Sequence, residues 1–384
     1  MNKPIQVLQP SYRIDECLVE FKGCLVAGWT GLGFKTVKFE EAWKNYTGLQ
    51  NAHFINSATA GLHLALNVLK RTKRWEEDKA EIITTPLTFV STNHAILYER
   101  LVPVFAGVHP RTFCLSPDSV ERMITPNTRA VIYVGLGGRY GHLQAISDLC
   151  KKYHLDLILD AAHMAGTRIF RQHVGHESDV SVFSFQSVKN LPTADGGMIC
   201  FKDPELDKLA RQMSWLGIDK DTYTRTNSQG NYKWKYDVPN VGFKYHGNSI
   251  MAAIGLVQLK YLDEDNQKRK ELAAQYTEEL DSEILIPGDV PGAVGSQHLY
   301  QIEVMQRMSR DELLLHLNKD NIFPGVHYVD STQYPMYKNC RGDIGAVVDT
   351  MELSKRLLTL PLHLNMTKED VSRVCHSVNT FVRS

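Results

Sequence analysis

The sequence of 384 residues lacks the features that mark several classes of protein. It has no excess charge of either sign, because 43 Lys and Arg residues balance 43 Asp and Glu residues. A chain without a basic excess has little with which to neutralise many phosphates, so we predict neither a nucleic-acid partner nor a membrane surface held by charge. No stretch approaches the roughly 18 uninterrupted apolar residues of a membrane-spanning helix. The N-terminal M-N-K-P-I-Q-V-L-Q-P has no apolar core of the signal-peptide type.

Paired cysteines are also missing. The seven cysteines are scattered, odd in number and form no C-x-x-C pair. This pattern is typical of reduced thiols, so we predict a cytoplasmic protein and no metal site. The chain also has no internal repeat and no low-complexity tract.

What the sequence does contain is an alternation of short apolar runs and helical stretches from about residue 50 to 200. The predicted strands are 81–85, 102–105, 129–134, 155–160 and 180–185, and the predicted helices are 58–67, 88–98 and 145–153. Strands separated by helices predict an α/β fold with a mostly parallel sheet that is covered on both faces. Ligands of such sheets bind beyond the carboxyl ends of the strands.

The rest of the chain predicts a second, smaller unit. Residues 217–247, rich in Asn, Gly, Tyr and Lys, are predicted as a long loop. A helix over 249–280, with a break near Asp263, then leads to shorter elements, which are a strand at 300–305 and helices at 310–317 and 369–381. We therefore predict a large domain over 20–265 and a small C-terminal α+β domain over 266–384, joined by residues 1–19.

One segment favours a different interpretation. The strand ending at Val134 is followed by Gly135-Leu-Gly-Gly138, a helix and a strand ending at Asp160, which resembles a nicotinamide-binding unit. However, the third glycine of that pattern comes one residue late, and the unit lies after several other strands. Glycine-rich turns between strands and helices are common for steric reasons alone. A dehydrogenase is therefore an alternative hypothesis.

Polar residues follow the ends of several predicted elements. Asp160 closes an apolar strand, and Lys189 stands between another buried strand and a glycine pair. Ser57 and Thr59 open an apolar helix, where hydroxyls and free amides can hold a phosphate. Each has a plainer interpretation, as a turn cap, a solvated charge or helix caps. Together they are what pyridoxal-phosphate chemistry requires, because a lysine must meet the cofactor aldehyde and an acid must keep the pyridine nitrogen protonated.

Longer motifs strengthen this interpretation. In chain order they are Gly28-Trp29-Thr30-Gly31, F-E-E-A-W at 39–43, S-A-T-A-G-L-H-L-A-L at 57–66, T-P-L-T-F-V-S-T at 85–92, D-A-A-H at 160–163, F-S-F-Q-S-V-K-N at 183–190, the glycine pair at 196–197, M-A-A-I-G-L-V-Q-L at 251–259, G-V-H-Y at 325–328 and L-P-L-H at 360–363. Their order over nearly the whole chain resembles the DegT/DnrJ/StrS family of sugar aminotransferases, a branch of the fold-type I pyridoxal-phosphate enzymes. The resemblance implies a three-layer fold with a mostly parallel sheet of seven strands and a smaller C-terminal domain.

The resemblance also implies roles for individual residues. Lys189 would form the Schiff base with the cofactor and then move a proton between substrate and cofactor carbons. Asp160 would pair with the pyridine nitrogen, His163 would lie near the ring hydroxyl, and Phe89 would stack on the ring. The positions that match phosphate binding are Ser57, Ala58, Thr59 and Ser184, and those that match the sugar site are Trp29, Thr30, His327 and Tyr328. Phe89 could equally be a core residue, and His327 a surface histidine.

The departures from the family pattern concern the substrate more than the reaction. The family's S-G-T is S-A-T at 57–59, its His-x-Tyr-Gly turn is Gly135-Leu-Gly-Gly138, and its G-E-G-G is Ala194-Asp-Gly-Gly197. Lys244 stands where a neighbouring subunit of the family usually offers an Asn to the phosphate, and a lysine can serve there as a point charge. A relative with histidine at the Schiff-base position is a dehydratase, so Lys189 favours transamination.

The resemblance therefore predicts an aminotransferase that works as a homodimer with shared sites. Glutamate or glutamine would donate the amino group, and a keto sugar would accept it, expected to be a nucleotide-linked 3- or 4-keto-6-deoxy hexose. Two further alternatives are the same reaction on a cyclitol or an acidic keto sugar, and a regulatory protein that binds the cofactor without turnover.

Overall fold

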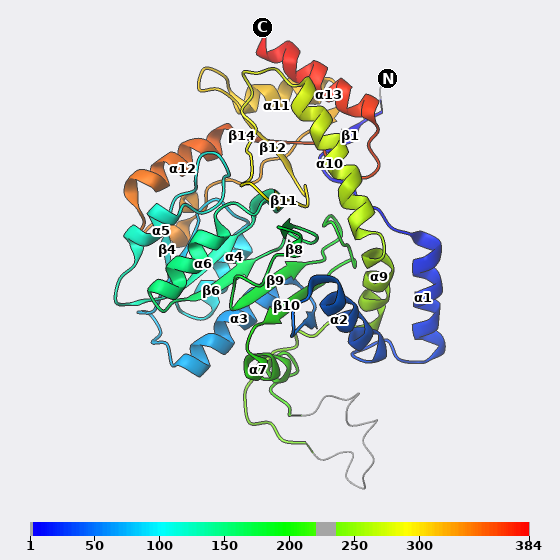
Figure 1. The fold of residues 1–384 in the computed structure, drawn as a ribbon, viewed down its shortest axis with the longest axis vertical. Helices are drawn as coiled ribbons and strands as arrows, with labels where there is room; N and C mark the ends of the chain where they lie inside the picture. The colour runs from blue at the N-terminus through cyan, green and yellow to red at the C-terminus, as the bar shows by residue number, and fades with distance from the viewer. Residues whose placement is uncertain (1–2, 220–235, 384) are drawn as a thin grey trace.

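The computed structural model describes residues 3–219 and 236–383 (Figure 1). The predicted loop over 217–247 thus lies partly outside the described residues. Its described ends, 217–219 and 236–247, contain isolated bridges but no helix. Figure 1 shows a central sheet wrapped by helices and a smaller unit that carries the C-terminus.

A sheet of seven strands forms the centre of the protein. In spatial order its strands are β2 (His53–Ile55), β10 (Gly197–Phe201), β9 (Val180–Ser184), β6 (Asp156–Asp160), β5 (Thr128–Val134), β3 (Glu81–Thr84) and β4 (Val102–Phe105). From β9 to β4 the neighbouring strands are parallel, whereas β10 is antiparallel to both β2 and β9. The predicted α/β class and the mostly parallel sheet are therefore confirmed.

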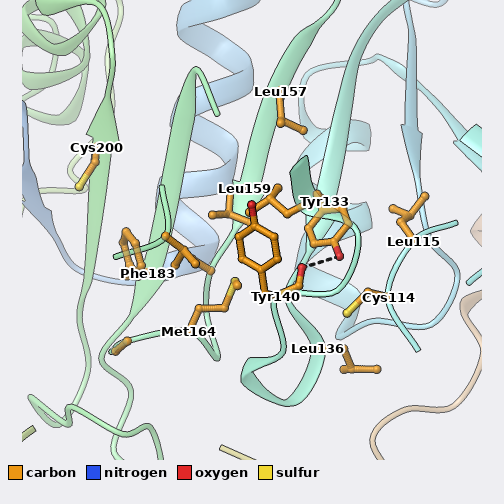
Figure 2. Close-up of a cluster of buried hydrophobic side chains, with 14 of the residues drawn as sticks. Cys114, Leu115, Tyr133, Leu136, Tyr140, Leu157, Leu159, Met164, Phe183 and Cys200 are labelled. Atoms are coloured by element: carbon orange, nitrogen blue, oxygen red, sulfur yellow. Dashed lines mark hydrogen bonds between the residues drawn. The ribbon is translucent and has the colours of Figure 1, made fainter. Parts of the chain in front are cut away.

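Helices cover this sheet on both sides, as its apolar strands require. They are α1 (Ile14–Val26), α2 (Phe34–Thr47), α3 (Ala58–Lys73), α4 (Val90–Tyr98), α5 (Pro117–Met123), α6 (Leu143–Lys152), α7 (Pro204–Ser214) and α9 (Ser249–Leu259). Alternate residues of a strand face opposite sides, so on β5 Ile132 joins the core under α3, α4 and α7, while Tyr133 joins the core of the other face. Figure 2 shows part of this second core, where the Tyr133 hydroxyl donates to the Tyr140 carbonyl at 2.9 Å.

The smaller unit has its own apolar core. Its helices and strands are β1 (Ile5–Gln6), α10 (Leu262–Glu279), β12 (Tyr300–Glu303), α11 (Arg310–Lys319), β13 (Ile322–Phe323), α12 (Ile344–Arg356), β14 (Leu357–Leu360) and α13 (Lys368–Val382). Short elements elsewhere are β7 (Arg168–Ile169), β8 (Gln172–His173), β11 (Ala293–Val294) and the 3-10 turns Leu136–Gly138, Ser331–Gln333 and Pro335–Tyr337. The predicted helix over 249–280 is indeed broken, at Lys260 and Tyr261 between α9 and α10.

Contacts cross between the two units at both ends of the chain. The N-terminal β1 pairs with β13 of the smaller unit, yet the following α1 packs against α9. Val347 of α12 packs on Phe105 of β4, at the edge of the large sheet. The domain boundaries drawn from the sequence stay a prediction. Among the described residues, no helix is both long and apolar enough to cross a bilayer.

Candidate active site

A cavity of about 380 Å³ lies at the carboxyl edge of the large sheet. This volume is in the range of small-molecule sites. Its walls come from strand ends, the turn after β9, the start of α3 and the smaller unit, and are formed by Leu8, Ser57, Ala58, Thr59, Leu62, Thr88, Phe89, Ser91, Val134, Asp160, Ala162, His163, Ser184, Gln186, Val188, Lys189, Asp195, Gly196, His298, His327 and Tyr328. Most of the predicted site residues therefore line one cavity.

Lys189 lies in the turn that leaves β9. Its backbone N–H donates to the Gln186 carbonyl at 2.8 Å, which closes a tight turn and directs the side chain into the cavity. Removal of water by the surrounding protein lowers the pKa of Lys189 to about 8, and the negative charge of Asp160 partly opposes this shift. About a tenth of Lys189 is thus a neutral amine at pH 7, and more at higher pH, far more than for an ordinary lysine, and a nucleophile or base must be neutral.

Asp160 is the last residue of β6 and is buried. Its Oδ2 accepts a hydrogen bond from the Thr92 hydroxyl at 2.7 Å, and its Oδ1 accepts one from the Ala162 N–H at 3.1 Å. Burial raises the pKa of Asp160, while these two donors and the charge of Lys189 lower it. The carboxylate is therefore fixed in orientation and faces the same cavity as Lys189.

His163 stands near the end of β6 with a defined proton position. The Gly137 N–H donates to its Nδ1 at 3.2 Å, so Nδ1 is bare and the proton is on Nε2. Nε2 then donates to the Tyr328 hydroxyl oxygen, 3.2 Å away. Burial, followed by the charge of Lys189, lowers the pKa of His163 well below its usual range, so the ring is neutral. Gly137, at φ +70°, belongs to the turn that departs from the family's sequence pattern, and here its backbone orients the histidine.

The first turn of α3 forms another wall. The Ser57 hydroxyl accepts the Ala60 N–H at 3.1 Å as a cap, while Ala58 and Thr59 line the cavity. Gly197 approaches this turn so closely that a Cβ atom there would lie 2.9 Å from the Ala58 nitrogen. A helix N-terminus that faces a cavity favours an anionic group such as a phosphate. Ser184, at the end of β9, lines the same cavity.

Phe89 and His327 lie toward the mouth of the cavity. The Phe89 ring is 57% exposed and its centroid is 5.9 Å from that of Tyr328. The His327 Nδ1 is 3.0 Å from the Thr359 hydroxyl, and burial lowers the pKa of His327 to about 4. Phe89 is thus not a core residue, and His327 is not a free surface histidine.

Three predicted site residues lie outside the walls of this cavity. The Trp29 indole N–H donates to the Leu32 carbonyl at 2.6 Å, and the Thr30 carbonyl accepts the Ser249 N–H at 3.1 Å. The Lys244 ammonium lies 3.3 Å from the centroid of the Trp215 ring. None of them is part of the cavity wall formed by the described residues of one chain.

Sequence reasoning missed two residues of the site. Thr92 lies within the T-P-L-T-F-V-S-T motif, but its link to Asp160 spans 68 positions and required the fold. His298 Nε2 lies 3.4 Å from Lys189 Nζ. The only local signal for His298 was a histidine just before a predicted strand.

Comparison with known proteins identifies the family. The sequence profile of the DegT/DnrJ/EryC1/StrS aminotransferase family matches residues 13–379. The spore coat polysaccharide biosynthesis protein SpsC of Bacillus subtilis is 33% identical over 378 residues, which cover 96% of this chain and 95% of SpsC.

Solved structures of aminotransferases superpose on the whole of this chain. PseC of Helicobacter pylori, an aminotransferase involved in pseudoaminic acid biosynthesis, superposes with a TM-score of 0.89 at 28% identity, over 100% of both chains. The putative sugar aminotransferase Spr1654 of Streptococcus pneumoniae, in its PMP form, has a TM-score of 0.90 at 26% identity, over 100% of this chain and 99% of Spr1654. The same protein is known in a PLP form. The chain therefore belongs to the DegT/DnrJ/EryC1/StrS aminotransferase family, and it is an enzyme of the pyridoxal-phosphate-dependent sugar aminotransferase type.

Proposed function

We propose that this enzyme moves an amino group from glutamate or glutamine to a keto sugar, with Lys189 as its reactive amine. The observation that carries the proposal is that Lys189 and the buried Asp160 face one cavity that is also bounded by the start of α3. A free amine, an oriented carboxylate and an anion-binding helix end are the three groups that pyridoxal phosphate chemistry needs.

The residues present fit this cofactor. Asp160 would face the pyridine nitrogen, with its orientation fixed by Thr92 and Ala162. The start of α3 would hold the phosphate through Ser57, Ala58 and Thr59, together with Ser184. Because residue 197 is a glycine, no Cβ atom crowds the Ala58 amide. When bound, pyridoxal phosphate supplies an aldehyde that takes up the amino group and a ring that accepts electrons from the substrate.

The side chains of this chain would then carry the proton transfers. Lys189 Nζ, with its pKa of about 8, would accept a proton from the substrate carbon and return it to the carbon on the far side of the transferred nitrogen. His163 donates from Nε2 to the Tyr328 hydroxyl oxygen, which leaves the Tyr328 O–H as a hydrogen-bond donor at the cavity wall. The exposed Phe89 and the partly buried His327 would contact the sugar or the ring.

For the acceptor we propose a nucleotide-linked 3- or 4-keto-6-deoxy hexose. SpsC, in spore coat polysaccharide biosynthesis, and PseC, in pseudoaminic acid biosynthesis, support a sugar of a surface polysaccharide or a related pathway. A cyclitol or an acidic keto sugar is the second candidate, because Trp29 and Thr30 lie outside the cavity of a single chain.

We further propose a homodimer that completes the site. One side of α1 carries exposed apolar residues, namely Ile14, Leu18, Val19, Leu25 and Val26. Several exposed large apolar side chains on one helix are typical of a protein interface. In such a dimer Lys244 would reach the partner's phosphate site, since it lines no part of the cavity in its own chain. A cytoplasmic location likewise stays a prediction.

An absorbance spectrum tests the reaction. Purified protein with added pyridoxal phosphate should develop a visible band, and glutamate or glutamine should replace it by a near-ultraviolet band. Keto sugars with and without a nucleotide should then restore the visible band at different rates, which ranks the acceptors. If no visible band forms, Lys189 is not the reactive amine. A band that ignores both donors would instead indicate a binding protein.

A further inference from the structure

A buried histidine lies beside the reactive lysine and has no role in the proposed function. We propose that His298 is a positioning residue for Lys189: its bare Nε2 accepts a hydrogen bond from the lysine amine and thereby directs the amine lone pair into the cavity. The inference rests on the proposed function, since it takes Lys189 to be the reactive amine.

The proton position on His298 follows from a chain of amides. The Asn266 side-chain NH₂ donates to the Ala165 carbonyl at 2.9 Å, so the Asn266 oxygen is the atom that faces Asn190. The Asn190 NH₂ donates to that oxygen at 2.6 Å and to the Ser296 carbonyl at 2.8 Å. Because backbone carbonyls can only accept, both amide orientations are determined.

These amide orientations determine which ring nitrogen of His298 carries the proton. The remaining Asn190 oxygen lies 2.9 Å from the His298 Nδ1, and it can only accept. Nδ1 therefore carries the proton, and Nε2 is a bare acceptor that lies 3.4 Å from Lys189 Nζ. Within the described residues, it is the acceptor found at hydrogen-bond distance from that nitrogen.

The surroundings of His298 keep this acceptor available. Its ring is 2% exposed, and burial lowers its pKa well below the usual range. The charged and titratable neighbours Lys189, His163, Arg269 and His327 all lower the pKa further. The imidazole is therefore neutral near neutral pH, which leaves Nε2 available as an acceptor.

The ring is also held in place without help from Lys189. The His298 backbone N–H donates to the Gly137 carbonyl at 3.0 Å, and the ring centroid is 4.4 Å from that of His163. A neutral amine has two N–H groups and one lone pair. When one N–H is donated to a preformed acceptor, the lone pair is left for the reacting carbon, as orientation-dependent catalysis requires.

The test uses the rate at which the cofactor-free protein captures pyridoxal phosphate, followed by the visible band over a range of pH. The wild type should reach half its maximal rate near the Lys189 pKa of about 8. His298→Leu removes the acceptor that stabilises the ammonium form more than the amine. The midpoint should therefore fall by about one pH unit, and the maximal rate by about tenfold because the amine is no longer oriented.

His298→Gln, which restores an acceptor oxygen, should have a midpoint and a maximal rate close to those of the wild type. His376→Leu, at an exposed histidine of α13, is the matched control and should change neither value.

A second measurement needs no loss of packing. In ¹⁵N-histidine-labelled wild-type protein, nuclear magnetic resonance should show the His298 ring, assigned through His298→Gln, protonated on Nδ1. A ring protonated on Nε2 would overturn the inference, and so would a His298→Leu protein with an unchanged midpoint and rate. If wild-type protein itself forms no visible band, the proposed function fails; if it does and the leucine variant behaves identically, only the role of His298 fails.

Discussion

The inner wall of the cavity (Asp160, His163, Lys189 and the first turn of α3) and its outer mouth differ in how they are built. On the inner wall, hydrogen bonds within one chain fix each polar group, such as Thr92 on Asp160 and Gly137 on His163. At the mouth, Phe89 is 57% exposed, and two of the four residues predicted to bind the sugar, Trp29 and Thr30, lie outside the cavity of the same chain. The difference is what the proposed function expects if one chain fixes the groups that carry the chemistry and a second chain completes the acceptor site.

The strongest test of the inner wall is Lys189→Ala. It removes both the nucleophile and the base, so turnover should fall by about 10⁴-fold or more. The cofactor should still bind weakly through its phosphate, without the visible band. Lys202→Ala, at an exposed lysine just after β10, controls for the loss of a charge. Substantial turnover in the Lys189 variant would mean that another amine does the work.

Asp160→Asn should lower the maximal rate by about 10²- to 10³-fold, because a neutral amide cannot keep the pyridine nitrogen protonated. The free energy of unfolding of the cofactor-free variant, by contrast, should be higher than that of the wild type at neutral pH. Burial raises the pKa of Asp160 in the folded protein, so its contribution to stability is complete below the unfolded-state pKa and is lost as pH rises through the folded-state pKa.

At neutral pH the cofactor-free Asn variant should therefore resist urea better than the wild type, and the advantage should shrink as pH is lowered. Unfolding curves at several pH values measure this. A variant that is less stable at neutral pH would show that the Thr92 and Ala162 hydrogen bonds outweigh the burial of the charge.

Lys244→Ala tests whether a second chain completes the site. If Lys244 reaches the partner's phosphate site, its loss removes a charge-assisted contact, and cofactor affinity should fall by about ten- to a hundredfold. Lys244→Asn, which places the family's residue there, should lose less. Cofactor titrations on both variants, with the oligomeric state checked by sedimentation, measure the effect. Equal affinity in all three proteins would rule out the role across the dimer.

The smallest expected effect is that of Thr92→Val, which keeps the shape but removes one hydrogen bond from the Asp160 carboxylate. The maximal rate should fall by about three- to tenfold, which corresponds to one such bond. Ser91→Ala, at the neighbouring cavity hydroxyl, provides the comparison. If the two variants behave alike, the link between Thr92 and Asp160 does not matter for the rate.

The sequence brought the inner-wall residues together for a physical reason, although their roles stay predictions. Asp160 and Lys189 follow buried strands, and the ends of parallel strands meet at one edge of the sheet, so order along the chain predicts proximity. The class of fold, the strands over 81–85 and 102–105 and the break in the helix near Asp263 could be read from apolar patterns in the same way.

The contacts that orient these groups could not be predicted. Thr92 and His298 approach their partners across 68 and 109 positions, and no local pattern encodes such distances. The turn at Gly135 resembles part of a dinucleotide motif, yet in the fold the backbone N–H of its Gly137 orients His163. Trp29 and Lys244 were assigned from the family pattern, and a single chain does not bring them to the cavity.

The antiparallel strand β10 has a consequence for motion. Because it returns beside β9, the segment that carries Lys189 is tied at both ends, with the Thr193 N–H donating to the Phe185 carbonyl at 2.7 Å and the Phe185 N–H to the Gly196 carbonyl at 2.8 Å. Amide protons at these ties should exchange with solvent only when the sheet itself opens, whereas those near Phe89 should exchange through local fluctuations. The lysine would then keep its place while the mouth adapts to different sugars.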